Sequence, residues 1–259
     1  MRRLVRLFLI AALILVALVL LLRETGVDQG AIDKAIETGL DTAETGYDLA
    51  LRPNATLDAR IAEIGPRATA RLEEKFRAAK VTWPPRRVAL LAFKDERVVE
   101  LQAQAGDGRW QAVHRYPVKA ASGELGPKLK EGDRQVPEGL YRVTFLNPNS
   151  SYHVSLRLDY PNAFDSQMGR RDGRSALGGD IMIHGRAASI GCLAMGDLAS
   201  EELFVLAYEV GLANVAVIIA PRDFRNPPAG SWSAAPASTP AWLPVLYAEI
   251  ETALSAYPR

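Results

Sequence analysis

The chain has 259 residues, which is enough for one or two domains with a substantial hydrophobic core. Hydrophobic residues make up 48% and charged residues 24%, as in ordinary globular proteins, and 31 basic side chains nearly balance 30 acidic ones. This balance gives no reason to expect a nucleic-acid partner, and the sequence has no glycine-rich phosphate-binding loop that would predict a cofactor.

Residues 4–22 form an apolar run that is broken only by Arg6. As a helix rising about 1.5 Å per residue, the run is roughly 28 Å long, close to the hydrocarbon thickness of a bilayer. The arginines at positions 2, 3 and 6 favour a cytoplasmic N-terminus. A cleaved signal peptide is the alternative, but the run is long for one and no small-residue cleavage site follows it. We therefore expect residues 1–23 to be an uncleaved transmembrane anchor.

Residues 24–85 show helical periodicity. Apolar residues recur at steps of three and four between Ile32 and Leu51, and again between Ile61 and Ala79. Gly65-Pro66 interrupts the second stripe, which predicts a kink or a division into two helices. We expect this region to be a short helical linker after the anchor.

Strand-like patterns begin after the Trp83-Pro84-Pro85 segment. The expected strands are bounded by Gly, Pro, Asn and Asp turns. They cover residues 88–93, 98–104, 110–118, 140–146, 152–158, 181–183 and 215–220. One helix is expected at 201–210. The sequence thus predicts an α+β, mainly β domain at 86–221, followed by a Pro- and Ala-rich tail at 222–259 with a short helix near 243–256.

The single cysteine, Cys192, lies eight positions after His184, which is one of three histidines. A cysteine attacks as its thiolate, and a nearby imidazole is the usual means of removing the thiol proton. A lone cysteine is also often a buried apolar residue, and the residues alone leave both interpretations open. Gly191 and Ser189 suit a tight loop whose N–H groups could bind an oxyanion. Export would favour disulfides, and a chain with one cysteine cannot form one internally, which favours a reactive thiol.

The segment from His184-Gly185 to Ser189-Ile190-Gly191-Cys192 and Met195 resembles the signature of the YkuD-type L,D-transpeptidase family. The resemblance covers approximately residues 87–220. Upstream segments resemble the YafK-type branch, which is associated with cleavage of the amide between peptidoglycan and a lipoprotein; they are residues 126–129, 137–141, 146–152 and 160–165. Ala194 stands where the general family has arginine, and the spacer from histidine to cysteine is shorter than in that family. Both departures agree with the YafK-type branch and put ordinary 3→3 cross-linking in doubt.

The resemblance implies an L,D-transpeptidase fold in which Cys192 is the nucleophile and His184 the general base and acid. The substrate would be a peptidoglycan stem peptide, attacked at the L-centre carbonyl of diaminopimelate through a thioester. Hydrolysis of a stem or lipoprotein amide is the favoured outcome. The alternatives are a transpeptidase that forms 3→3 cross-links or attaches proteins, and a non-enzymatic module that binds wall peptides. The resemblance also implies a place in cell-wall turnover or cell shape, with the domain in the periplasm and the anchor in the inner membrane of a Gram-negative bacterium.

The remaining site assignments are less direct. The backbone N–H groups of Gly191 and Cys192 are the candidates for an oxyanion hole, with Ser189 as support for the loop. The resemblance implies that a backbone carbonyl orients His184, with Asp180 a weaker alternative. Expected substrate contacts are Lys128, Asn147, Asn149, Tyr152 and Arg186, with Lys130 and Arg174 as further anion partners. His114 and His153 are expected to be structural, and His184 with Cys192 has too few further ligands for a zinc site. A catalytic thiol should be alkylated well below its ordinary pKa of about 8.5.

Overall fold

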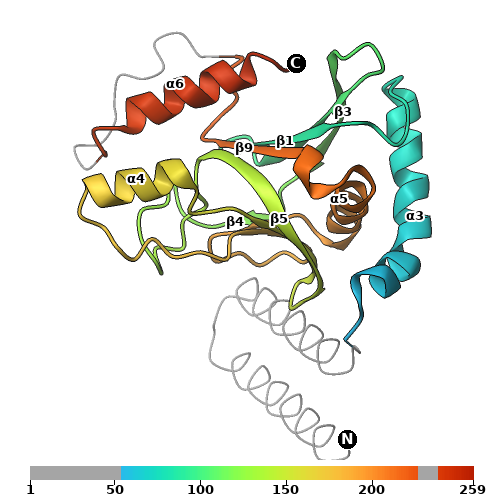
Figure 1. Cartoon of the computed structure of the whole chain (residues 1–259), viewed down its shortest axis with the longest axis horizontal. Coiled ribbons are helices and arrows are strands. Elements are labelled where there is room, and N and C mark those ends of the chain that lie inside the picture. Colours follow the sequence, from blue (N-terminus) through green and yellow to red (C-terminus); the bar gives the residue numbers. More distant parts are fainter. Residues whose placement is uncertain (1–53, 227–238) are drawn as a thin grey trace, which may run out of the picture. The chain divides into compact units, whose positions relative to one another are not determined.

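The computed structural model describes residues 54–226 and 239–259, and residues 55–259 form one compact unit (Figure 1). The expected anchor at 4–22, the first expected helix and most of the Pro-rich segment lie outside the described ranges. In the part that is described, no helix is both long enough and apolar enough to cross a membrane.

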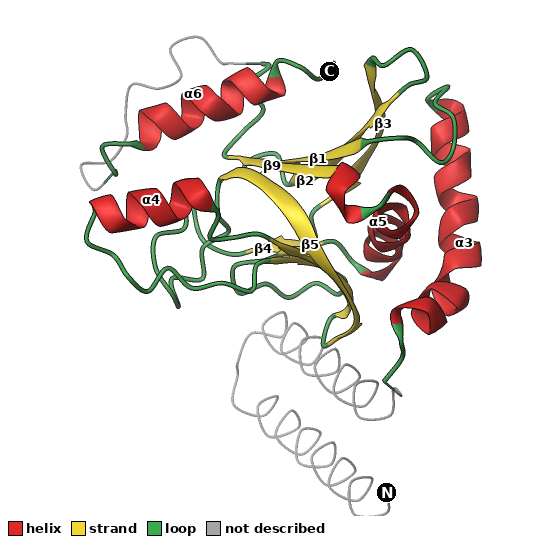
Figure 2. Ribbon diagram, viewed as in Figure 1, coloured by secondary structure: helices red, strands yellow, loops and turns green. Residues whose placement is uncertain are grey.

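A nine-stranded mixed sheet has the strand order β3-β2-β1-β9-β5-β6-β7-β8-β4. The sheet lies between the helices of the unit (Figure 2). Its middle strands are held by parallel pairing of β1 with β9 and antiparallel pairing of β9 with β5. The strands are β1 Val88–Phe93, β2 Val98–Gln104, β3 Trp110–Pro117, β4 Ala120–Ala121, β5 Gly139–Ser150, β6 His153–Leu158, β7 Met182–His184, β8 Leu193–Ala194 and β9 Val215–Ala220.

Helices cover both faces of the sheet, and the sequence of β1 shows why. All six residues of this strand are buried. Val88, Leu90 and Ala92 join one hydrophobic core, whereas Leu91 and Phe93 join the other. Because side chains alternate between the two faces of a strand, a continuous apolar run is what a strand covered on both faces requires.

The first face is covered by α3 (Leu57–Ala78) and α5 (Asp197–Val210), and the short 3₁₀ helix Leu212–Asn214 follows α5. Thr56 caps α3 by accepting the Ala59 N–H at 3.2 Å. The expected division at Gly65-Pro66 is wrong, because α3 continues through Pro66 as one helix. Its buried stripe of Ile64, Ala68, Leu72 and Phe76 packs into the core, which holds the helix together across the proline.

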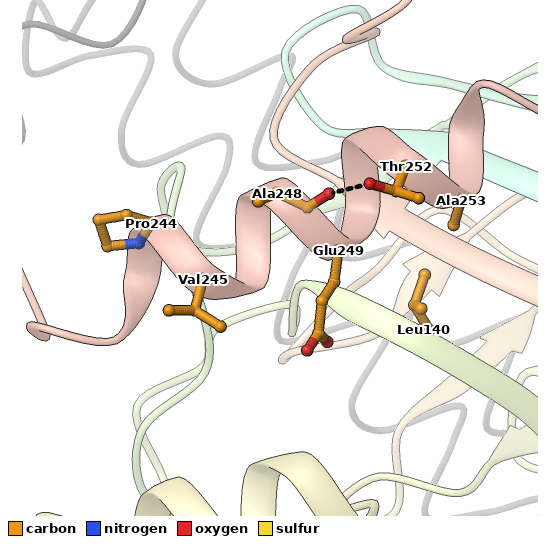
Figure 3. A pocket seen from close by; sticks show the side chains of 7 residues that line it. All are labelled: Leu140, Pro244, Val245, Ala248, Glu249, Thr252 and Ala253. Atoms are coloured by element: carbon orange, nitrogen blue, oxygen red, sulfur yellow. Dashed lines mark hydrogen bonds between the residues drawn. The ribbon is translucent and has the colours of Figure 1, made fainter.

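The second face is covered by α4 (Ala163–Arg171) and α6 (Leu243–Leu254). Leu246, Ile250 and Leu254 of α6 are almost fully buried against this face. A largely apolar cavity of about 690 Å³ lies between α6 and Leu140 (Figure 3). None of the predicted site residues lines it.

The expected mixed α+β class is confirmed, and most expected strands agree with the structure to within a few residues. Helix content is larger than the mainly β expectation. The helix α4 was not expected, and α3 and α6 lie outside the 86–221 range yet pack on its sheet within the same compact unit.

Candidate active site

The pairing of β7 with β8 sets the position of His184 relative to Cys192. These two strands are parallel, with Ile183 opposite Leu193 and His184 opposite Ala194. Extending this register by one residue places Cys192 opposite Met182. Because Met182 and His184 are two residues apart on one strand, their side chains leave the same face of the sheet. Cys192 immediately precedes β8, so the residue that carries the sulfur lies at the start of the strand that pairs with the His184 strand.

His184 is held in one tautomer by its own backbone. The side chain is 2% exposed, and Nδ1 lies 2.6 Å from the carbonyl oxygen of Gly185. A carbonyl can only accept, so Nδ1 carries the proton and Nε2 keeps its lone pair. Burial lowers the pKa of His184, although the Gly185 carbonyl opposes this shift. The alternative expectation was that Asp180 orients His184. It is wrong, because the Asp180 carboxylate pairs with Arg157 Nη2 at 2.8 Å.

The Cys192 thiol is half-buried, and Sγ donates to the carbonyl oxygen of Asp180 at 3.7 Å. Burial raises the pKa of this thiol above its ordinary value; a backbone hydrogen bond from Met182 and the Lys128 ammonium partly oppose the shift. Among the contacts of the described residues, no hydrogen bond joins Sγ to the imidazole of His184. The directions of both pKa shifts favour a neutral thiol and a neutral imidazole at neutral pH, which differs from the low-pH alkylation expected of a catalytic thiol.

Two serine hydroxyls hold the loop that carries Cys192. Ser189 Oγ donates to the Cys192 carbonyl at 2.6 Å and accepts the Cys192 N–H at 3.2 Å. Ser122 Oγ accepts the Gly191 N–H at 2.6 Å and donates to the Arg134 carbonyl at 2.7 Å. Gly191 has φ +102°, a conformation that favours glycine. Both N–H groups expected to form the oxyanion hole therefore donate to hydroxyls in this structure.

Ser122 is a site residue that sequence reasoning missed. It follows β4, whose pairing with β8 brings Ser122 beside a loop 67 residues away in the sequence. A serine in a stretch of small residues carries no local signal of such a contact.

A second group of contacts packs against His184 from β6 and the hairpin before it. The Tyr152 ring lies over the imidazole, with 4.6 Å between centroids and 30° between planes. The Gly185 N–H donates to the Tyr152 carbonyl at 3.0 Å. A Cβ on Gly185 would lie 2.5 Å from Asp197 Oδ1 and 2.8 Å from the Tyr152 oxygen, so only glycine fits after His184. Tyr152 is thus the expected substrate residue that the structure places directly against the imidazole.

The other expected substrate residues are engaged elsewhere. Asn149 makes two hydrogen bonds to the backbone of Ala55 at 2.9 Å, and Asn147 accepts the Asn149 N–H at 3.0 Å. These amides fix the start of α3 against the β5 hairpin. The ammonium of Lys128 is buried and pairs with Asp133. Lys128 therefore acts on the thiol through its charge, without a hydrogen bond to it.

Two further side chains, those of Arg186 and His153, have polar partners, and His114 packs against an aromatic ring. The backbone N–H of Arg186 donates to Asp197 Oδ1 at 2.8 Å, and its guanidinium lies 3.7 Å from Asp197 Oδ2. The structural reading of two histidines agrees with their contacts: the His153 ring lies 3.0 Å from Glu201, and the His114 ring packs edge-on against Tyr116.

Comparison with known proteins places this site in a family. The model of the YkuD L,D-transpeptidase catalytic domain matches residues 88–217. Two relatives, from Escherichia coli strain K12 and E. coli O157:H7, are both named "Putative L,D-transpeptidase YafK"; each is 37% identical over 119 residues, or 45% of this chain. The chain spans about half of these relatives, since the match covers 46% of each.

Among solved structures, the cell-shape-determining protein Pgp2 of Campylobacter jejuni is similar at a TM-score of 0.42 and 22% identity, covering 60% of this chain and 55% of that one. Bd1075 of Bdellovibrio bacteriovorus is similar at a TM-score of 0.38 and 19% identity, covering 54% and 50% of the two chains. From the family match over residues 88–217, which include both His184 and Cys192, this chain belongs to the YkuD family of L,D-transpeptidase catalytic domains.

Proposed function

We propose that this protein is a peptidoglycan-modifying cysteine enzyme that acts on the L-centre carbonyl of diaminopimelate in stem peptides. The observation that carries this proposal is the position of His184 at the end of β7 and of Cys192 immediately before the parallel neighbouring strand β8, with Nδ1 bound to a carbonyl and Nε2 left with its lone pair. General-base activation of a thiol requires a nearby imidazole that is held in one orientation and has a free lone pair.

The reaction begins from the neutral pair. As Sγ of Cys192 attacks the carbonyl carbon, the thiol proton passes to Nε2 of His184. The C–N bond of the amide then breaks, and the imidazolium returns this proton to the departing nitrogen. A thioester and a free amine result. In hydrolysis, water gives a proton to Nε2 and attacks the thioester, which releases the acid and restores the thiol.

The developing oxyanion requires donors near the sulfur. The N–H groups of Gly191 and Cys192 are our candidates, and each must leave its serine hydroxyl partner or share it with the substrate oxygen. Catalysis then includes a small rearrangement of the Ser122 and Ser189 contacts. Removal of one oxyanion-hole donor typically lowers kcat by about 10²–10³.

Hydrolysis is the outcome that we favour. Ala194 and the short spacer between His184 and Cys192 are shared with the YafK-type branch and depart from the general family pattern. A peptidoglycan-linked lipoprotein or a stem amide would be the substrate, with the domain held in the periplasm by an anchor at 4–22. A transpeptidase would use the same thioester but give the acyl group to an amine of a second stem.

The activity is tested on purified sacculi in H₂¹⁸O with wild-type protein and Cys192→Ala. We expect amide cleavage with one ¹⁸O in the new diaminopimelate carboxyl, and no cleavage by the variant. New 3→3 dimers without ¹⁸O would instead identify a transpeptidase. A trapped thioester on Cys192, detected by mass spectrometry, supports both enzymatic outcomes.

A binding module is the second candidate, because burial raises the pKa of the Cys192 thiol and leaves it neutral. Such a module would bind stem peptides equally well with cysteine or alanine at position 192 and release no product. Equal sacculus binding together with no turnover would replace the enzymatic proposal.

A further inference from the structure

We propose that a polar cavity beside Cys192 is a subsite for a zwitterionic amino-acid centre, such as the free D-centre of a diaminopimelate side chain. This inference rests on the proposed function. The cavity, which we call the arginine pocket, has a volume of about 610 Å³. This volume lies within the range of about 300–1,000 Å³ that is usual for small-ligand sites. Its polar lining includes Glu131, Arg157, Ser166, Arg170, Arg174 and Asp180.

The arginine pocket is connected to the sulfur by three consecutive residues. Gly178, Gly179 and Asp180 line the pocket, and the carbonyl oxygen of Asp180 lies 3.7 Å from Sγ of Cys192. Gly178 runs close to the opposite wall, since a Cβ there would lie 3.1 Å from Cα of Glu131. The segment is therefore both a wall of the pocket and a neighbour of the nucleophile.

The substrate has the length to reach this pocket. In diaminopimelate, six bonds separate the attacked L-centre carbonyl carbon from the D-centre carboxylate carbon. Three bonds of an extended chain span up to about 3.6 Å, so the two groups are up to roughly 7 Å apart. A carbonyl held at Sγ thus leaves the D-centre within range of residues just beyond Asp180.

The charges of the arginine pocket match a zwitterion. Three guanidinium groups and two carboxylates line it. Arg157 is already paired with Asp180 at 2.8 Å. The side chains of Arg170 and Glu131 make no hydrogen bond or ion pair with any other residue in the described ranges. One unpaired cation and one unpaired anion therefore remain for a carboxylate and an ammonium group.

Arg174 makes one side of the pocket rigid. Its Nη1 donates to the Leu129 carbonyl at 2.7 Å, and its Nη2 bonds Asp172 at 2.7 Å. Its guanidinium also lies 6.0 Å from the Trp242 ring centroid. A guanidinium fixed before binding loses little rotamer entropy when an anion arrives, which favours a built site over a chance cluster of surface charges.

The test measures binding separately from turnover, using the 259-residue chain with Cys192→Ala. The probes are a stem tripeptide ending in diaminopimelate and the same peptide with the D-centre carboxylate amidated, titrated by calorimetry. We expect amidation and Arg170→Gln each to weaken binding about tenfold, because a charge-assisted contact is lost. Arg171→Gln is the matched control, since Arg171 is the next residue, is exposed and does not line the pocket.

Equal affinities for the two peptides, or equal effects of Arg170→Gln and Arg171→Gln, would overturn the subsite. Absence of binding by the tripeptide would overturn it as well. Failure of wild-type protein to turn over sacculi would instead contradict the proposed function, whereas Arg170-dependent binding in the inactive variant would still support the pocket.

Discussion

The Tyr152 ring lies against the imidazole of His184, with 4.6 Å between ring centroids. The same residue accepts the Gly185 N–H through its carbonyl at 3.0 Å. Tyr152 thus contacts the ring of His184 and the backbone of the next residue, whose carbonyl in turn fixes Nδ1. The orientation of the proposed base depends on packing from the β5–β6 hairpin as well as on its own strand.

Replacing the aromatic ring of Tyr152 should therefore lower kcat, because the ring helps to orient the proposed base, His184. Ring pairs of this kind contribute about 0.5–1.5 kcal/mol, so Tyr152→Leu should reduce kcat about threefold to tenfold. Tyr152→Phe keeps the ring and should retain most of the activity. Steady-state hydrolysis of a stem peptide measures both variants. If Phe and Leu were equally impaired, the hydroxyl would be acting on substrate and the packing explanation would fail.

The Ser122 hydroxyl is predicted to position the loop that carries the proposed nucleophile, Cys192. Ser122→Ala removes its hydrogen bonds to Gly191 and Arg134, each worth about 1 kcal/mol. We expect kcat to fall about tenfold with a smaller change in KM, and the free energy of unfolding to fall by about 1–2 kcal/mol. Ser122→Thr keeps the hydroxyl and should restore kcat.

The control for this effect is Ser151→Ala, because Ser151 is exposed. A higher kcat in Ser122→Ala would show that the hydroxyl blocks the Gly191 N–H, and that its role in holding the loop is minor.

Local patterns predicted much of the fold and the centre of the site. The apolar run at Val88–Phe93 predicts a strand because only a doubly covered strand buries every residue. His184 and Cys192 could be proposed as a catalytic pair from the sequence because eight positions separate them and their glycine neighbours suit a tight loop. Their relation depends on one short connection, which the sequence contains in full.

Long-range packing could not be predicted in the same way. Ser122 meets Ser189 only because β4 pairs with β8. From the sequence, the segment of α6 is predicted to belong to the tail. Its position on the sheet depends on the apolar faces of β1 and β9. The raised pKa of Cys192 also follows from burial, which a one-dimensional pattern does not contain.

The pH dependence of catalysis and of alkylation should show that His184 and Cys192 are both neutral at neutral pH. Burial lowers the pKa of His184, so kcat/KM should rise on the acid side with a midpoint below about 6.5 and then stay level. Burial raises the pKa of Cys192, so its alkylation by iodoacetamide, which needs the thiolate, should increase only above pH of about 8.5. His184→Gln should remove the acid limb. Rapid alkylation at pH 6 would show instead a thiolate–imidazolium pair.

Gly185 should tolerate no side chain. In Gly185→Ala the new Cβ would lie 2.5 Å from Asp197 Oδ1 and 2.8 Å from the Tyr152 carbonyl oxygen. Overpacking of this kind costs about 1–3 kcal/mol, and the shift would also move the carbonyl that orients His184. We expect a lower midpoint in thermal unfolding and a loss of activity. Gly106→Ala, where nothing lies within 4 Å of the new Cβ, should change neither quantity.

Arg71 connects α3 to α5 through ionic contacts. Its substitution tests whether α3 unfolds together with the rest of the domain. It pairs with Glu202 at 2.7 Å and Glu201 at 3.0 Å, both largely buried. Arg71→Met should lower the free energy of unfolding by about 2 kcal/mol, below the 3–5 kcal/mol typical of a broken buried pair, because Lys75 still pairs with Glu202. Urea unfolding measures the change, and exposed Arg67→Met on the same helix is the control. Equal stability of the two variants would mean that α3 contributes little to the folded domain, whereas a selective loss in Arg71→Met would place it in the same cooperative unit as α5.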